Sequence, residues 1–433
     1  MKKLRLPILL SGALMLTAGS FFMTSCSKDG NDGKDGTNGT DAIATCKECH
    51  NPSVVDRVAT EFALSKHNYG EAAAGEAGNT SCGPCHESEG FKYVCKNNVS
   101  TVFTFDAVTG KWVNPYATVS SSAFGPLTCF TCHSSLHTTY GYADMSALTT
   151  TAAVPMTMWG GAKTINLTQD GGKSHLCVKC HQPRPLTCSA QSDSRLLNYD
   201  SIRDNPSIIF WDSTAGFVSK YIKPSYRMHV HYGAVGAVFA GVGGIEFPGS
   251  EPFSSSSHAT LASCQDCHMA PITGAAGGHS FKAKGNFNGC NVSGCHTTMS
   301  TTASLFTDTR AEIKGLLDTL AAHINSVGAG HDILHKDVSV GTDGSYNNLW
   351  YGLTSKNYDG YTDIYDASSN PLGYWSLAGS STLKKFPTLK FVHIGAMINF
   401  QFCLREYSLG VHNTQYSRAL LTNSIEALKA LGY

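Results

Sequence analysis

The sequence lacks an excess of charge of either sign. Lys plus Arg and Asp plus Glu number 32 each in 433 residues, and only 15% of the residues are charged. A neutral chain offers no basic field that would hold a phosphate backbone, so we expect no nucleic-acid partner. Intrinsic disorder is excluded for most of the chain, because 42% of its residues are hydrophobic and can supply the core of one large or two modest domains.

Long hydrophobic runs are also lacking, except at the start of the chain. Basic residues there precede an apolar stretch over residues 6–23, which is typical of an export signal, although its length would also allow it to span a bilayer. The stretch ends in MTSC, which resembles the lipobox of bacterial lipoproteins. We therefore predict a lipoprotein signal peptide over residues 1–25 and lipidation of Cys26. The exported protein would be anchored to a membrane, facing the periplasm or the cell surface, for example at the outer membrane.

The segment after Cys26 contains no large apolar side chain from residue 27 to residue 42. Its Gly, Asp, Asn and Lys residues cannot bury themselves, which predicts a flexible tether over residues 26–45. The alternation of Asp and Gly could suggest calcium binding, but the terminal Glu of a calcium loop is missing. The tether is therefore the preferred interpretation.

Cysteine and histidine, by contrast, are abundant, with 16 and 18 residues. A chain that can bury a core does not need so many thiols for disulfides. The pattern Cys-x-x-Cys-His occurs five times, and at this chain's own residue frequencies about 0.02 matches would arise by chance. The five copies are Cys46–His50, Cys82–His86, Cys129–His133, Cys177–His181 and Cys264–His268.

This spacing is typical of the covalent attachment of c-type haem. Two thiols on one helical turn add to the vinyl groups of the haem, and the adjacent imidazole can ligate the iron. A sixth motif, CNVSGCH, has four residues between Cys290 and Cys295 and ends in His296, a spacing that tetrahaem cytochromes of sulfate reducers also use. Zinc would need a second Cys/His pair to close each tetrahedron, and disulfides need no following His.

We therefore predict six haem c groups as cofactors. The predicted attachment cysteines are Cys46, Cys49, Cys82, Cys85, Cys129, Cys132, Cys177, Cys180, Cys264, Cys267, Cys290 and Cys295. The predicted proximal iron ligands are His50, His86, His133, His181, His268 and His296. Of the other cysteines, Cys95 and Cys188 could form a disulfide in an oxidising compartment, whereas Cys403 is expected to be an inert core residue.

The region from His258 to the C-terminus resembles the second half of the ammonia-forming pentahaem cytochrome c nitrite reductases and, more loosely, the hydroxylamine oxidoreductase group. The shared order is a His before CQDCHMAP, a Gly-His pair at 278–279, the motif ending at His296, and long helices containing GVHN at 410–413. The resemblance implies distal ligands for four haems. They are His412 for the haem on His268, His258 for that on His296, His279 for that on His133 and His67 for that on His181.

For the haems on His50 and His86 the candidates are His137, His175 and the pair His229/His231, of which we prefer His175 together with either His229 or His231. The chain also departs from the reductases at His86, where their catalytic motif has a Lys instead of a His. It lacks their Arg shortly before that motif, and their Tyr and calcium site after the third haem motif. We therefore expect one His of the 229/231 pair to close the distal face of this haem, since nothing evident would bind and protonate an oxyanion there.

These features predict a protein that carries electrons through a chain of mostly bis-histidine haems, with other redox proteins or a quinol-linked donor as partners. The alternative is a reductase or oxidoreductase of a small nitrogen or sulfur compound at the haem on His86, with His229, His231, Arg227 and Tyr232 lining an open pocket. A third interpretation is a haem-bearing filament subunit.

The expected fold is mainly α-helical with little strand, in which the haems form much of the core. Residues 46–300 form the predicted hexahaem region, with a helix near Val54–Leu64 and a hairpin near Thr101–Val113. Residues 301–433 form a helical region, in which residues 332–390 are a surface insertion that could instead be a docking surface. The helices are expected at residues 313–324, 392–409 and 414–431, and they either pack internally or form a homodimer.

Overall fold

A computed structural model describes thirteen stretches of the chain. They are residues 52–70, 82–97, 104–106, 111–113, 125–133, 148–183, 186, 197–211, 230–328, 332–336, 353–365, 371–374 and 387–433. The predicted signal peptide, tether and first haem motif therefore lie outside the described residues, as do Cys26, Cys46, Cys49, His50, Cys188, Arg227 and His229.

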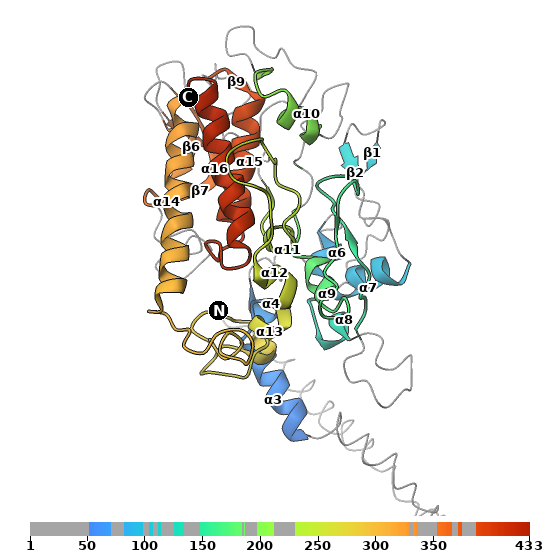
Figure 1. Cartoon of the computed structure of the whole chain (residues 1–433). Coiled ribbons are helices and arrows are strands. Elements are labelled where there is room, and N and C mark those ends of the chain that lie inside the picture. The colour runs from blue at the N-terminus through green and yellow to red at the C-terminus, as the bar shows by residue number, and fades with distance from the viewer. Residues whose placement is uncertain are drawn as a thin grey trace, which may run out of the picture. The chain divides into compact units, whose positions relative to one another are not determined.

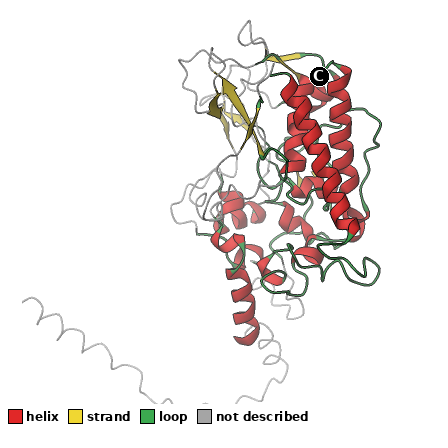
Figure 2. Ribbon diagram, turned by 90° about the vertical axis from the view of Figure 1, so that its left-hand side faces the viewer, coloured by secondary structure: helices red, strands yellow, loops and turns green. Residues whose placement is uncertain are grey.

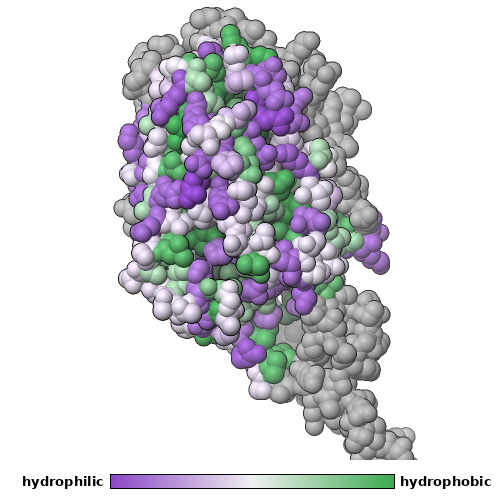
Figure 3. Space-filling view, viewed as in Figure 1, coloured by the Kyte–Doolittle hydropathy of each residue, from purple (hydrophilic) through white to green (hydrophobic). Residues whose placement is uncertain are grey.

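The chain divides into two units, Met1–Val54 and Val55–Tyr433. Only the second unit is described at length. Within the described stretches, no helix is both long and apolar enough to cross a membrane. On the face seen in Figure 3, hydrophobic residues are scattered among hydrophilic ones.

Three long helices near the C-terminus pack against one another (Figures 1 and 2): α14 (Ser304–Ser326), α15 (Phe391–Leu404) and α16 (Thr414–Ala430). The helical spacing of Ile313, Leu317 and Leu320 gives α14 one buried stripe. All 14 residues of α15 are buried, which makes it the central helix. The three predicted C-terminal helices are confirmed, although α15 ends five residues before the expected boundary at Leu409.

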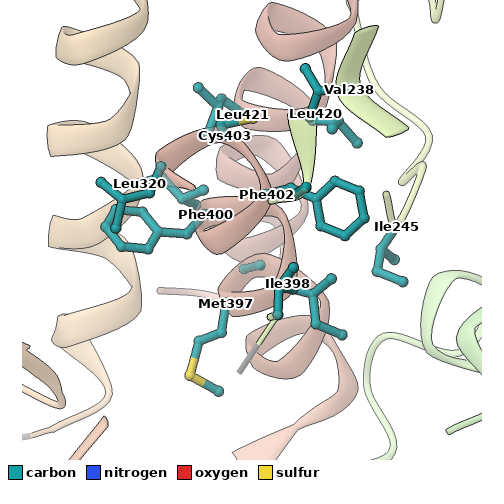
Figure 4. Packing of buried hydrophobic residues seen from close by; sticks show 14 of the residues in the cluster. Val238, Ile245, Leu320, Met397, Ile398, Phe400, Phe402, Cys403, Leu420 and Leu421 are labelled. Carbon is teal, nitrogen blue, oxygen red and sulfur yellow. The ribbon is translucent and has the colours of Figure 1, made fainter. Parts of the chain in front are cut away.

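The core around α15 contains both apolar and polar contacts. Figure 4 shows Phe400 pointing toward Leu320 of α14, and Phe402 pointing toward Ile245 in the loop on the other side. The buried amide of Asn399 accepts a hydrogen bond from the Ile245 N–H at 2.8 Å and donates one to its carbonyl at 2.7 Å. This pair of bonds ties residues 230–247 to the helices and satisfies an amide that would otherwise be costly to bury.

The strands are short and antiparallel. The predicted hairpin is confirmed as β1 (Thr104–Asp106) with β2 (Lys111–Val113). β3 (Val154–Pro155) pairs with β4 (Thr164–Ile165), and β5 (Ile209–Trp211) pairs with β9 (Leu389–Lys390). Inside the expected insertion at 332–390, β6 (Leu334–Lys336), β7 (Tyr358–Tyr365) and β8 (Pro371–Tyr374) form a three-stranded sheet that the sequence analysis did not anticipate. The prediction of a mainly helical fold with little strand is confirmed.

The motif-bearing region contains short helices. Each of the four described Cys-x-x-Cys-His motifs carries one: α6 (Gly83–His86), α8 (Cys129–Cys132), α9 (Ser174–Val178) and α13 (Cys264–His268). The others are α3 (Pro52–Ala63), α4 (Lys66–Tyr69), α7 (Ser88–Lys96), α10 (Tyr199–Asp204), α11 (Val235–Ala240), α12 (Ser257–Leu261) and the 3-10 turn η2 (Gly278–Ser280). The expected helix near Val54–Leu64 is confirmed as α3.

Candidate functional site

The described Cys/His motifs share one backbone arrangement, a tight turn that brings the His back to the first Cys. In four of them the N–H of the His donates to the carbonyl of the first Cys: His86 to Cys82 (3.0 Å), His133 to Cys129 (3.0 Å), His181 to Cys177 (2.9 Å) and His296 to Cys290 (3.0 Å). The longer CNVSGCH loop therefore closes in the same way as the shorter motifs. It accommodates its two extra residues with Gly294 at a φ of 87°, a conformation that favours glycine.

Local capping also helps to form these turns. In α13 the Ser263 hydroxyl accepts from the Asp266 N–H, and the Asp266 carboxylate accepts from the Ser263 N–H at 2.8 Å. Thr128 and Thr131 form the equivalent box at α8. A capping box satisfies the free N–H groups at the start of a helix, so a single turn can form at each place. The two cysteines of the motif then lie on that turn.

Four histidines from outside the motifs lie against motif histidines. The ring pairs are His67 with His181 (5.9 Å between ring centres), His279 with His133 (6.4 Å), His258 with His296 (5.9 Å) and His412 with His268 (6.2 Å). These are the four pairs that the resemblance implied. The members of a pair are up to 146 residues apart, so the fold, and not local sequence, brings them together.

The spacing of each pair fits one iron between the two rings. An iron–nitrogen bond of roughly 2 Å on each side, and about 1.1 Å from each nitrogen to its ring centre, separate two axial imidazoles by roughly 6 Å. The observed spacings lie between 5.9 and 6.4 Å. The four pairs thus have the separation that axial ligation of a haem iron requires.

Hydrogen bonds orient several of these rings. The Nδ1 atom of His268 lies 2.9 Å from the Phe281 carbonyl, and that of His258 lies 2.7 Å from the Val411 carbonyl. A carbonyl can only accept, so each Nδ1 carries the proton and the lone pair of the ring is on Nε2. Bonds of this kind commonly fix the tautomer and orientation of metal-binding histidines.

His181 is held in the neutral state that ligation requires. Burial, together with repulsion from the imidazoles of His67, His268 and His86, lowers the pKa of His181 to about 3. Burial also lowers the pKa of His67 and of His268. At physiological pH these rings keep a lone pair for a metal, because an imidazolium has none.

The motifs follow one another in space. Cys180 hydrogen-bonds to Cys85, a contact that together with burial raises the pKa of Cys180 well above its usual value. Cys177 hydrogen-bonds to Cys264, which raises the pKa of Cys177 and lowers that of Cys264 to about 7. Figure 1 shows α6, α8 and α9 close together, and α9 also contacts α13.

The series continues at both ends. Cys132 lies close enough to Cys177 and Cys180 to raise their pKa values. Cys290 in the same way raises the pKa of Cys267. The spatial order is therefore the motifs ending at His86 and His133, then at His181, His268 and His296. Motifs that are far apart in the sequence lie next to one another in this series.

Phe281 connects three of the ring pairs. Its ring centre lies 4.9 Å from that of His67 and 5.8 Å from that of His279, and its carbonyl accepts from His268. The residue has a φ of 55°, in the left-handed region that non-glycine residues seldom adopt. This conformation directs the ring and the carbonyl toward different imidazoles.

His175 is arranged differently from the paired histidines. Its Nδ1 lies 2.7 Å from the Thr151 carbonyl, and its Nε2 accepts the Leu167 N–H at 2.6 Å. Both ring nitrogens are therefore used within the protein, and the structure speaks against His175 as a distal ligand. The side chain is buried and acts here as a structural link between α9 and the preceding loop.

The region near His231 contains an arginine that the sequence analysis did not consider. Arg405 is fully buried at the end of α15, its guanidinium lies 4.7 Å from the Tyr232 ring centre, and it donates to the Val230 carbonyl. His231 packs edge-on against Tyr232 with ring centres 5.6 Å apart. A Cβ at Gly233 would lie 3.6 Å from the His181 ring, so this segment passes close to a motif histidine.

Two carboxylates near the ring pairs were also missed. Glu61 of α3 accepts from the His279 backbone N–H at 3.0 Å, and Glu406 contacts Nδ1 of His412 at 2.5 Å. The sequence carries one indication of the second, because Arg405 and Glu406 interrupt an otherwise apolar run. Charged residues in such a run are seldom buried without a partner.

The two described cysteines outside the motifs, Cys95 and Cys403, compare differently with their predictions. Cys403 is buried in the core as predicted, where burial raises its pKa well above the usual value. Cys95 bears a free thiol, so the expected disulfide with Cys188 is wrong for this structure. The thiol of Cys95 is half-buried, and burial raises its pKa to about 11, which makes it unreactive at neutral pH.

Comparison of the chain with protein-family models, curated proteins and solved structures finds no match. The likeness to the nitrite reductases thus rests on the motif order and ligand spacing alone and remains a prediction. Among the described residues, no three His, Cys, Asp or Glu side chains converge as a metal cluster would require. A tetrahedral zinc site needs four such donors, whereas an axially ligated haem iron takes two imidazoles, as the ring pairs offer.

Proposed function

We propose that the chain is an exported, lipid-anchored hexahaem c-type cytochrome that carries electrons along a series of mostly bis-histidine haems. The observation that carries the proposal is the set of four imidazole pairs, each with one motif and one non-motif histidine at 5.9–6.4 Å. Export and anchoring rest on the N-terminal sequence. Replacing Cys26 by Ser should release the protein from the membrane fraction.

Haem c, when bound, supplies an iron that takes up and releases one electron. The motif cysteines would hold the porphyrin covalently, and the two imidazoles of each pair would hold its iron. The Nδ1 bonds of His258 and His268 to backbone carbonyls fix the orientation of these rings and leave the lone pair on Nε2. Two strong-field imidazoles favour the low-spin state in both oxidation states, which suits electron transfer.

The series of neighbouring motifs supports a chain of closely spaced redox centres. Among the five described motifs, Cys295 at one end and Cys129 at the other are exposed, whereas Cys177 and Cys180 between them are partly buried. The motifs ending at His133 and His296 are therefore the described places at which electrons would enter or leave. Partners that fit these ends are other redox proteins or a quinol-linked donor.

The proposal is tested by counting and characterising the haems of the purified full-length protein. Pyridine haemochrome and intact mass should give six haems, and a count of five would remove the CNVSGCH site. Electron paramagnetic resonance of the ferric protein should show only low-spin iron. The nearly parallel rings of His268 and His412 (17°) and the nearly perpendicular rings of His258 and His296 (82°) predict two distinguishable low-spin signals.

A matched pair of variants tests the ligand assignment. His412→Met should change the spectrum of one haem in six, because a thioether replaces one axial imidazole. His175→Gln should leave every haem spectrum unchanged, because both ring nitrogens of His175 already have protein partners. An unchanged spectrum for His412→Met would remove that assignment.

Arg405 favours one second candidate function. The expected lack of an anion clamp was an argument against a reductase, yet the buried guanidinium of Arg405 lies beside the ring of Tyr232, which itself packs against His231. If about one haem in six is high-spin, the haem on His86 becomes the candidate centre for reducing a small nitrogen or sulfur compound. Nitrite, hydroxylamine and sulfite are then the substrates to assay.

A further inference from the structure

The contact between Glu406 and His412 differs from the other contacts that orient the paired imidazoles. Oε2 of Glu406 lies 2.5 Å from Nδ1 of His412. The Nδ1 atoms of His268 and His258 instead face neutral backbone carbonyls. His279 also has a carboxylate near Nδ1, that of Glu61, but at the longer distance of 3.6 Å.

Glu406 is built to remain charged although it is fully buried. The Ser408 hydroxyl donates to Oε2 at 2.5 Å, and the Ser408 and Gly410 N–H groups donate to Oε1 at 3.1 and 3.0 Å. The carboxylate therefore accepts from three donors of its own loop besides the imidazole of His412, and its side chain is fully buried. A buried carboxylate with this many donors is arranged to carry its charge out of contact with water.

We infer that Glu406 is a positioning residue that makes His412 a strongly electron-donating ligand of the haem on His268. Glu406 would thereby lower the reduction potential of that haem. This inference rests on the proposed function. A carboxylate that accepts the Nδ1 proton increases the basicity of Nε2, because it draws the ring toward imidazolate. A more basic ligand and a nearby negative charge both stabilise ferric over ferrous iron. Second-shell hydrogen bonding is one of the recognised ways in which proteins set haem potentials.

The position of this haem makes the effect consequential. The motif ending at His268 lies between those ending at His181 and His296, as the contacts of Cys264 with Cys177 and of Cys267 with Cys290 show. A low potential at this haem would raise the free energy of an electron that passes between the neighbouring motifs ending at His181 and His296. Glu406 would therefore slow electron transfer between those two neighbours.

The test is a potentiometric titration of the full-length, haem-loaded protein with Glu406→Gln. The glutamine keeps the size of the side chain but removes the charge. We expect the midpoint potential of one haem in six to rise by at least the equivalent of a tenfold change in its one-electron equilibrium constant, about 59 mV. The matched control is Glu426→Gln, because Glu426 accepts from Ser250 at the surface and contacts no histidine, and it should leave all six potentials unchanged.

The outcomes separate this inference from the proposed function. A protein without haem would overturn the proposed function, whereas a fully loaded Glu406→Gln protein with six unchanged potentials would overturn the role of Glu406 alone. If Glu406→Gln does not fold, Glu406→Asp keeps the charge but is one methylene shorter. It should raise the same single potential by less, and an unchanged potential in that variant would equally reject the inference.

Discussion

Two regions of this chain are packed in different ways. In α15 every residue is buried, and large side chains such as Phe400 and Phe402 fill the space between it and its neighbours. From residue 248 to residue 312, all of them described, the only buried apolar side chains are those of Ala259, Ala270 and Ala276. That segment carries two of the Cys/His motifs and two of the non-motif histidines that pair with motif histidines.

The contrast shows that one chain can use two sources of stability. Burial of a large apolar side chain contributes about 1.5–3 kcal/mol, so the helices α14 to α16 can be held by their own residues. Residues 248–312 have no comparable apolar core and are instead connected by turns, caps and hydrogen bonds. A large apolar group bound to the motifs is what such a segment would need, and six haems are the proposed source.

The largest expected effect comes from removing one of these groups. Cys264→Ala combined with Cys267→Ala should prevent attachment at one motif and lower the hydrogen-exchange protection of residues 251–303 by roughly 100-fold or more. Protection of α15 and α16 should remain, because their core consists of side chains. The control is Cys403→Ala, which removes a buried cysteine that belongs to no motif. If residues 251–303 kept their full hydrogen-exchange protection in the double variant, the proposed difference between the two regions would be wrong.

The next effect concerns the helical core. Phe400 is fully buried, points toward Leu320 and lies 6.5 Å from the Tyr358 ring centre. Phe400→Ala should lower the free energy of unfolding of the helices by about 3–5 kcal/mol through lost burial and a cavity. Leu305→Ala, at a position that is 59% exposed, should change it by less than about 0.5 kcal/mol. Haem content should stay at six, and a fall would mean that the two regions fold as one unit.

A smaller effect follows from the buried His393 of α15. Burial and the charge of Lys390 lower its pKa to about 4, whereas in the unfolded chain it titrates near its ordinary value. The unfolded state therefore binds the additional proton between pH 6.5 and 4. The stabilising contribution of the neutral ring is complete above that range and is lost progressively as the pH falls through it.

This prediction can be checked with denaturant unfolding at several pH values. The difference in unfolding free energy between the natural protein and His393→Gln should fall by about 2–3 kcal/mol from pH 7 to pH 4. Gln can still accept the Lys390 N–H that Nδ1 of His393 accepts at 2.9 Å. A difference that does not depend on pH would show that the ring is already charged or already exposed.

Much of the helical region could be predicted from sequence, because its signal is local. The spacing of Ile313, Leu317 and Leu320 predicts α14, and apolar runs predict α15 and α16. The end of α15 was misplaced, because residues 405–409 contain neither Gly nor Pro to mark the end of a helix, yet the backbone turns there with Tyr407 and Leu409 at positive φ. The sheet within residues 332–390 was missed because its first strand, β6, is only three residues long and a long connection separates it from β7.

The sequence by itself determined the motif cysteines, their adjacent histidines and the turn on which each motif lies, because these features depend on residues within one turn of one another. Only the tertiary structure decided which distant histidine faces which motif. It placed His412 opposite His268, engaged both nitrogens of His175, and buried Glu406 and Arg405 near the paired rings. Such choices depend on how segments outside a single helical turn pack against one another, and the spacing within one motif carries no information about that packing.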